Sequence, residues 1–119
     1  MLKDYTFQTG YDAARRMLEK PGRPTALVCL SDLLGAGALR VAHEMGLLIP
    51  EDLSVVGMGN LMASQIVWPA LTTVAIPTVE MAAKAADMLL DQIMGVDVSP
   101  EAVFETRLIA RESSGPAPD

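Results

Sequence analysis

The stretch that decides the fold reads Pro24-Thr25-Ala26-Leu27-Val28-Cys29-Leu30-Ser31-Asp32, continues as a helical pattern to Met45-Gly46, and ends Leu53-Ser54-Val55-Val56-Gly57-Met58-Gly59-Asn60. Two short apolar runs in it, 26–30 and 53–56, are bounded by turn-forming residues and are typical of buried parallel strands. With the amphipathic helix between them they predict a βαβ unit. Such units bind ligands beyond the carboxyl ends of their strands, so we expect a ligand site at 31–32 and 58–60.

The flanking sequence predicts further elements of the same α/β layout. They are a helix over 10–19 capped by Thr9, a short helix or ordered loop over 60–67, a strand or crossover over 71–76, a helix over 79–93 capped by Thr78, and a strand over 103–110. The proline-rich polar tail over 113–119 is predicted to fray. A chain of 119 residues has room for one small domain.

Composition argues against several classes of protein. Fifteen acidic residues against nine basic ones give a net charge of −6, which is unfavourable for gripping a nucleic-acid backbone. The single cysteine, Cys29, cannot form an internal disulfide, which fits a reducing cytoplasm. There is no signal-peptide pattern and no apolar run of ~18 residues, so we expect a cytoplasmic protein without a membrane span.

The sequence offers no convincing catalytic or metal-binding set. The Gly57-x-Gly59 pair lacks the third glycine of a dinucleotide fingerprint, since Met62 stands there. A single histidine, His43, and the absence of paired cysteines argue against a metal site. Cys29 lies within an apolar strand and is expected to be an inert thiol. The sequence therefore predicts a non-enzyme with no cofactor and no metal.

The joint order of several short motifs resembles the lactose/galactose-repressor family of bacterial transcription regulators. The motifs are Pro-Thr-Ala at 24–26, Ser-Asp at 31–32 before a Gly-Ala-Leu helix, Pro-Glu-Asp-Leu-Ser-Val-Val-Gly at 50–57 and Pro-Ala-Leu-Thr-Thr-Val at 69–74. The resemblance runs from about Asp4 to Ser114. It implies a parallel-sheet lobe of the periplasmic-binding-protein-like (type I) fold, with three αβα layers.

A complete regulator of that family has an N-terminal helix-turn-helix domain, a hinge, and a two-lobed sensor with its ligand between the lobes. The resemblance implies that residues 1–119 are part of the effector-binding sensor, without the helix-turn-helix and most of the first lobe. DNA would be contacted only through the missing domain. Two alternatives stay open: a sugar-binding protein of a transport system, and a degenerate remnant that dimerises without a ligand.

The resemblance also suggests ligand contacts. Tyr5 falls where the family places an aromatic ring that stacks on the ligand, whereas its spacing alone favours a surface tyrosine near the start of the chain. Ser31 and Asp32 fall where the family has Asn-Asp, of which the first reaches the ligand. Asp32 could instead stabilise the start of its helix, where a carboxylate is favourable whatever the function.

The most informative departure from the family pattern is at Gly59, followed by Asn60 as a further candidate ligand contact. Many members carry an aspartate at the Gly59 position that accepts hydrogen bonds from the ligand. Either ligand binding has been lost, or the ligand is itself negatively charged and would be repelled by that carboxylate. We favour the second interpretation, because Gly57-Met58-Gly59-Asn60 resembles the Gly-Phe-Gly-Asp of family members that sense gluconate-like sugar acids. That resemblance implies a sugar acid such as gluconate as the small-molecule effector.

The helix over 33–44 and the segment over 60–68 correspond to the dimer surface of the family. The candidate contacts of a homodimer are Leu39, Arg40, Glu44 and Trp68. An exposed apolar patch around the tryptophan would be costly for a monomer. The alternative is that these side chains pack inside the chain itself.

Overall fold

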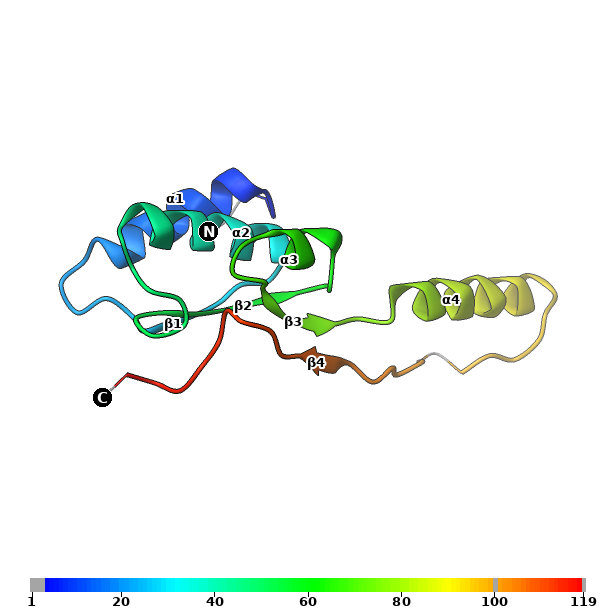
Figure 1. Ribbon diagram of the computed structural model, residues 1–119. Helices are drawn as coiled ribbons and strands as arrows, with labels where there is room; N and C mark the ends of the chain where they lie inside the picture. Colours follow the sequence, from blue (N-terminus) through cyan, green and yellow to red (C-terminus); the bar gives the residue numbers. More distant parts are fainter. Residues whose placement is uncertain (1–3, 100, 119) are drawn as a thin grey trace. The chain divides into compact units, whose positions relative to one another are not determined.

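The computed structural model describes residues 4–99 and 101–118 (Figure 1). In chain order the elements are α1 (Phe7–Leu18), β1 (Ala26–Val28), α2 (Asp32–Glu44), β2 (Ser54–Met58), α3 (Met62–Ile66), β3 (Thr72–Ala75), α4 (Thr78–Ile93) and β4 (Arg107–Ile109). The chain divides into two compact units. The first is Met1–Ala75 with Leu108–Asp119, and the second is Ile76–Arg107.

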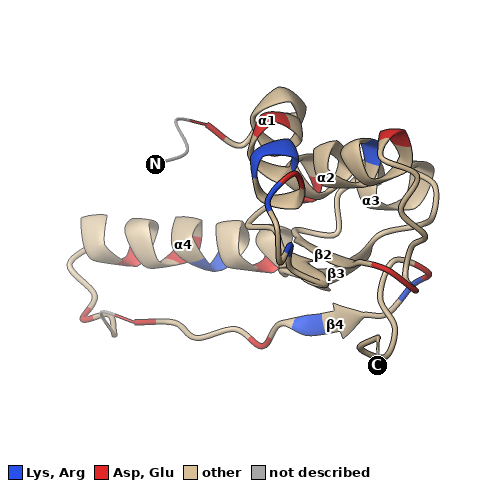
Figure 2. Ribbon diagram, turned by 90° about the vertical axis from the view of Figure 1, so that its left-hand side faces the viewer, with Lys and Arg blue, Asp and Glu red and all other residues tan. Residues whose placement is uncertain are grey.

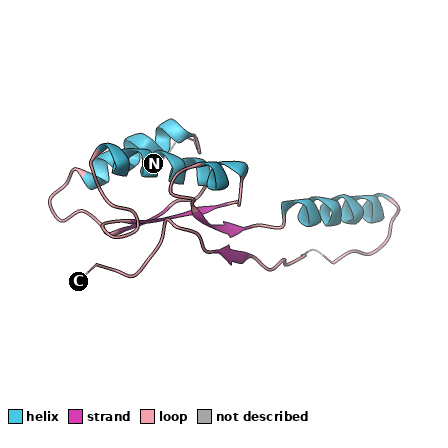
Figure 3. Ribbon diagram, in the orientation of Figure 1, coloured by secondary structure: helices cyan, strands magenta, loops and turns pink. Residues whose placement is uncertain are grey.

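The strands form one sheet in the order β1-β2-β3-β4. β1 and β2 are parallel, with Ala26 opposite Ser54, and β2 and β3 are parallel, with Val56 opposite Thr72. The helices α1, α2 and α3 lie over one face of this sheet (Figure 3). The predicted α/β class with a parallel sheet is therefore confirmed, although each strand is short.

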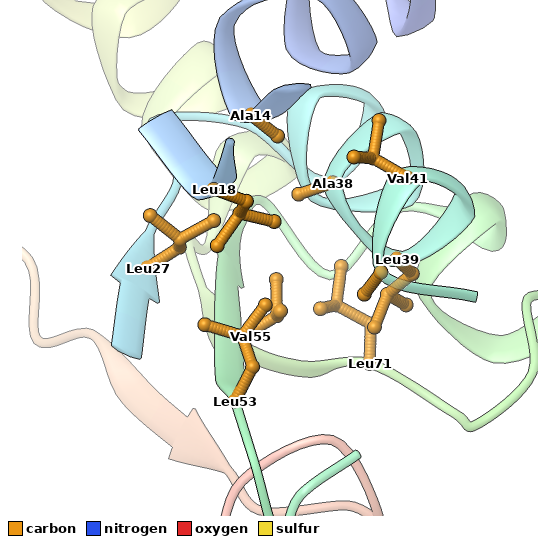
Figure 4. Close-up of a cluster of buried hydrophobic side chains, with 10 residues drawn as sticks. Ala14, Leu18, Leu27, Ala38, Leu39, Val41, Leu53, Val55 and Leu71 are labelled. Atoms are coloured by element: carbon orange, nitrogen blue, oxygen red, sulfur yellow. The ribbon is translucent and has the colours of Figure 1, made fainter. Parts of the chain in front are cut away.

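The core lies between β1–β3 and the helices α1 and α2, and it is aliphatic, as the composition predicts. Figure 4 shows its side chains converging from both layers. Its buried members are Ala14, Leu18, Leu27, Ala38, Leu39, Val41, Ala42, Leu53, Val55 and Leu71. Glycines let α1 and α2 approach closely: a Cβ at Gly37 would overlap the Phe7 carbonyl oxygen, and one at Gly10 would overlap backbone atoms of Leu34.

The helix boundaries depend on caps that the sequence locates only in part. The sequence allows either Ser31 or Asp32 as the cap of α2, and the structure has Ser31 there, because its hydroxyl accepts a hydrogen bond from the Leu33 N–H at 3.1 Å. The prediction of Thr9 as the first cap is wrong. Thr6 takes that role by accepting from the Thr9 N–H at 3.2 Å, so α1 begins three residues earlier than the predicted Gly10.

The cap predicted at Thr78 is also wrong. Thr78 is the first residue of α4, Pro77 occupies the cap position, and no side chain caps the helix. None of the residues described in α4 is buried, although the sequence places an apolar stripe along it. No helix within the described part of the chain is both long enough and apolar enough to cross a bilayer.

The tail that was predicted to fray is ordered where it begins, so that prediction is wrong at Ser113. The Ser113 side chain is buried, its hydroxyl donates to the Val55 carbonyl oxygen at 2.6 Å, and it accepts from the Thr72 N–H at 2.8 Å. The Val55 N–H in turn donates to the Ser113 carbonyl oxygen at 2.7 Å. The first residues of the tail therefore bridge β2 and β3. Asp119 lies outside the described residues.

Candidate functional site

Asp32 is the centre of the predicted ligand edge. It is the first residue of α2 and is fully buried. Its Oδ1 accepts from the Thr73 hydroxyl at 2.5 Å, and its Oδ2 accepts from the Leu61 N–H at 2.6 Å. Both carboxylate oxygens are thus bound within the chain, at a helix start that favours negative charge. Asp32 joins α2, β3 and the loop that follows β2.

That loop reverses the chain with two residues of positive φ. Gly59 has φ 119° and Asn60 has φ 52°, a region that favours glycine and tolerates asparagine. The Gly59 N–H donates to the Val74 carbonyl oxygen at 2.8 Å, and the Asn60 N–H donates to the Thr73 hydroxyl at 3.3 Å. A Cβ at Gly59 would lie 3.8 Å from the Oδ2 of Asp32. The structure therefore brings Asp32, Gly59 and Asn60 together.

Arg111 joins this cluster, and the sequence analysis did not single it out. Its guanidinium donates to the Asn60 Oδ1 at 2.8 Å, to the Ser64 hydroxyl at 3.0 Å and to the Leu71 carbonyl oxygen at 2.8 Å. Arg111 lies 51 residues after Asn60. No helical or strand spacing connects positions so far apart, and the only signal was that the ending over 108–114, which contains this arginine, resembles the Leu-Val-x-Arg-x-Ser close of the family's regulators.

The other two candidate ligand residues occupy different surroundings. Ser31 is half-buried beside Asp32, and its hydroxyl already caps α2. Tyr5 precedes α1 and is 58% exposed, and its hydroxyl has no hydrogen-bond partner within residues 4–99 and 101–118. The contacts of the chain therefore fix Ser31 near the cluster but leave the Tyr5 ring free.

A cavity of about 220 Å³ lies elsewhere, between α1 and β1. It is lined by small and apolar side chains, and none of the five candidate ligand residues lines it. Cys29 does, and burial raises the pKa of its thiol to about 11. A thiol with that pKa stays protonated near neutral pH, which agrees with the predicted inert role.

The candidate dimer residues separate into three situations. Leu39 is 4% exposed and packs in the core, so it presents almost no surface to a partner. Arg40 and Glu44 lie on the outside of α2, where Figure 2 shows charged residues of both signs along α1 and α2. Trp68, after α3, is 86% exposed. Of the four, Trp68 offers the largest free apolar surface.

Glu44, on α2, accepts hydrogen bonds from side chains of both α1 and α2. Its Oε2 accepts from the Tyr11 hydroxyl and from the Arg15 guanidinium, both at 2.6 Å, and its Oε1 accepts from Arg40 at 2.7 Å. The Arg15 guanidinium also lies over the Tyr11 ring, 5.0 Å from its centroid. The cluster joins the two helices through charged and aromatic groups at the surface.

Replacing Glu44 by glutamine is expected to remove an acid-sensitive part of the stability. The Tyr11 hydroxyl, and then Arg40, hold the pKa of the Glu44 carboxyl below its ordinary value. Because folding lowers this pKa, the stabilisation is present above the unfolded-state pKa of ~4.3 and is lost as the pH falls through the folded-state pKa. Urea unfolding from about pH 7 to about pH 3 should give a difference between wild type and Glu44→Gln that shrinks with acidity. Glu80→Gln, on the exposed face of α4, is the control, and a difference independent of pH would contradict the expectation.

Residues 2–114 match the family described as the periplasmic binding protein-like domain. The HTH-type transcriptional repressor CytR of Escherichia coli (strain K12) is 40% identical over 116 residues, which are 97% of this chain and 34% of the repressor. This chain therefore belongs to the periplasmic binding protein-like domain family, and the members it matches confirm the resemblance to sensor domains of the lactose/galactose-repressor type.

Two solved structures support this assignment. The transcriptional regulator CelR in complex with cellobiose has a TM-score of 0.88 at 37% identity, over 93% of this chain and 34% of that one. The lac repressor dimer bound to operator and the anti-inducer ONPF has a TM-score of 0.88 at 28% identity, over 93% of this chain and 39% of that one. The chain spans about a third of the length of the curated relatives it matches.

Proposed function

We propose that this chain is the effector-binding part of a transcription regulator and that its effector is a small sugar or sugar acid. The observation that carries the proposal is the convergence of Asp32, Gly59 and Asn60 at one edge of a sensor-type sheet. The relatives CytR and CelR are a transcriptional repressor and a cellobiose-bound regulator, which supports a regulatory role over a transport role. In this function the domain binds its effector without catalysing a reaction, in the cytoplasm.

The polar groups at this edge favour an anionic effector. Asp32 is already bound on both oxygens, and Gly59 adds no second carboxylate. The Arg111 guanidinium donates to neutral acceptors and makes no ion pair with any residue in the described part of the chain. Because Arg111 holds the Asn60 Oδ1, the Nδ2 amide of Asn60 is the group left to donate to a ligand. A sugar acid such as gluconate supplies a carboxylate that can accept a hydrogen bond from this amide. Ser31 supplies a hydroxyl, and Tyr5 supplies a ring on which the ligand can stack.

An effect on DNA would require a DNA-binding domain outside residues 1–119. CytR is named as a helix-turn-helix repressor, and the chain covers only 34% of it. Binding of an effector would shift the equilibrium between two conformations of the whole regulator, and this shift would change its affinity for DNA. The chain by itself is therefore not expected to bind an operator.

The effector proposal is tested by thermal unfolding of the chain with gluconate, neutral sugars and purine nucleosides. A ligand that binds only the folded state at about 100 times its dissociation constant adds about 2.7 kcal/mol of stability. We expect gluconate to raise the unfolding temperature and the neutral sugars to leave it unchanged. A rise with neutral sugars alone would contradict the sugar-acid assignment, and a cooperative transition that no ligand moves would contradict effector binding.

Dimerisation is proposed through the surface formed by Trp68 and Arg40. Replacing Trp68 by glutamate should weaken the homodimer roughly thirtyfold or more, the ~2 kcal/mol typical of a buried aromatic anchor. Sedimentation equilibrium measures the change, and Leu48→Glu, at an exposed apolar position outside this surface, is the control. Because Trp68 is 86% exposed in the single chain, Trp68→Glu should change the free energy of unfolding of the monomer little. A wild-type monomer, or a Trp68→Glu dimer of unchanged affinity, would contradict this surface.

A further inference from the structure

The Arg111 side chain contacts the connection between β2 and β3, residues 59–71, along its whole length. The three acceptors of its guanidinium are Asn60 at the beginning of that connection, Ser64 within α3, and Leu71 at the end of the connection. The Leu71 N–H also donates to the Ser64 carbonyl oxygen at 2.8 Å. The end of the connection is therefore hydrogen-bonded to its middle, and the guanidinium binds its start, middle and end.

The base of Arg111 is itself fixed. Its backbone N–H donates to the Thr72 hydroxyl at 2.9 Å, and the next two residues donate their N–H groups to the Ala70 carbonyl oxygen at 3.1 Å. Ser113 then inserts between β2 and β3. A planar guanidinium on an anchored backbone loses little conformational freedom when it makes several hydrogen bonds. Arg111 is thus held at its backbone as well as at its charged end.

The loop needs such support because Asn60 has a left-handed backbone. Asparagine tolerates φ 52° better than most side chains do, but this backbone still costs energy, which contacts with the surroundings offset. The contacts of Asn60 are its N–H to Thr73 and its Oδ1 from Arg111. The backbone bond fixes where the residue lies, and the side-chain bond fixes which way the amide faces.

We propose that Arg111 is a positioning residue for the ligand loop. It holds Asn60 in the left-handed turn with its Nδ2 amide directed to the ligand, and through Ser64 it holds α3 against that loop. The ligand part of this inference rests on the proposed effector function, whereas the positioning of residues 59–71 can be tested without any ligand. Arg111 acts through Asn60 and needs no contact with the effector itself.

The test uses the 119-residue chain with Arg111→Gln and Arg111→Lys. Arg16→Gln, at an exposed arginine of α1, is the matched control. Amide hydrogen exchange followed by NMR reports each backbone N–H separately. In Arg111→Gln the amides of residues 59–71, apart from Pro69, which has none, should exchange about tenfold faster or more, while those in the middle of α2 keep their rates. Arg111→Lys keeps the charge but not the fork, so its exchange should be intermediate.

Two exchange results would overturn the positioning role. One is an unchanged rate over residues 59–71 in Arg111→Gln. The other is an equal acceleration in α2, which would make Arg111 a general contributor to stability. Arg16→Gln is expected to match wild type throughout.

Affinity for gluconate, measured by calorimetry where the variant remains folded, tests the link to the ligand. Arg111→Gln should weaken binding at least tenfold, and Arg111→Lys should restore part of it. Equal affinity in Arg111→Gln and wild type, despite faster loop exchange, would overturn that link. If wild type binds none of the panel, the effector proposal itself fails, and the exchange rates alone decide whether Arg111 holds the loop.

Discussion

Replacing Asp32 by alanine is expected to lower the free energy of unfolding by roughly 3–5 kcal/mol. The change removes two hydrogen bonds to a buried charge and leaves the Thr73 hydroxyl and the Leu61 N–H without their acceptor. It also removes the negative charge from the start of α2. A domain of this size has only ~5–15 kcal/mol of stability, so the effect should be severe.

Urea unfolding followed by circular dichroism measures the loss. Asp12→Ala removes an exposed carboxylate from α1 and should change stability by no more than ~0.5 kcal/mol. Asp32→Asn keeps the size of the side chain but replaces one acceptor oxygen by an NH2 donor. That donor would face the Leu61 N–H or the Thr73 hydroxyl, which are donors themselves, so this variant should also be strongly destabilised. An Asp32→Ala variant as stable as Asp12→Ala would contradict the structural role of this carboxylate.

Replacing Ser113 by alanine is expected to cost about 2–4 kcal/mol. Its hydroxyl is the partner of two buried backbone groups, the Val55 carbonyl and the Thr72 N–H, and both would lose that partner. Such groups are costly when they are left unsatisfied away from water.

The neighbouring serine provides a matched control for the same measurement. The Ser114 hydroxyl shares a hydrogen bond of 2.8 Å with the Thr72 hydroxyl. This bond joins two side chains and involves no backbone group. Ser114→Ala should therefore cost less than ~1.5 kcal/mol. Equal losses for the two alanine variants would show that Ser113 does not have the special role assigned to it.

Much of the fold could be predicted because its signals are local. The cap at Ser31, the apolar face of α2 and the stop at Gly46 are separated by a few helical turns, and the chain follows them. The two core strands were predicted from short apolar runs bounded by turn residues, and both form within about two residues of the predicted bounds. Local patterns of this kind largely determine local structure.

The features that sequence reasoning missed depend on contacts between distant residues. Arg111 and Asn60 are 51 positions apart, and Ser113 and Val55 are 58 apart. No periodicity connects such pairs, so the tail was expected to fray and the arginine was not singled out. Burial is the second limit: Leu39 and Trp68 were both proposed for the dimer surface, yet one lies in the core and the other is almost fully exposed.

Within the candidate site, the sequence identified the edge but not the bonding. Ser31, Asp32, Gly59 and Asn60 do gather there, as the βαβ rule predicts. That Asp32 is bound on both oxygens within the chain could not be predicted, because Thr73 and Leu61 come from other elements. Their roles as ligand contacts, and that of Tyr5, stay predictions.

The proposed sugar-acid site is tested most directly by mapping the amide chemical shifts of the chain by NMR during a titration with gluconate. The largest shifts should fall on Ser31, Gly59, Asn60 and Leu61, beyond the carboxyl ends of β1 and β2. Shifts confined to Met17, Val28 and the other residues that line the cavity between α1 and β1 would contradict it. An unchanged spectrum at millimolar gluconate would contradict the sugar-acid assignment as well.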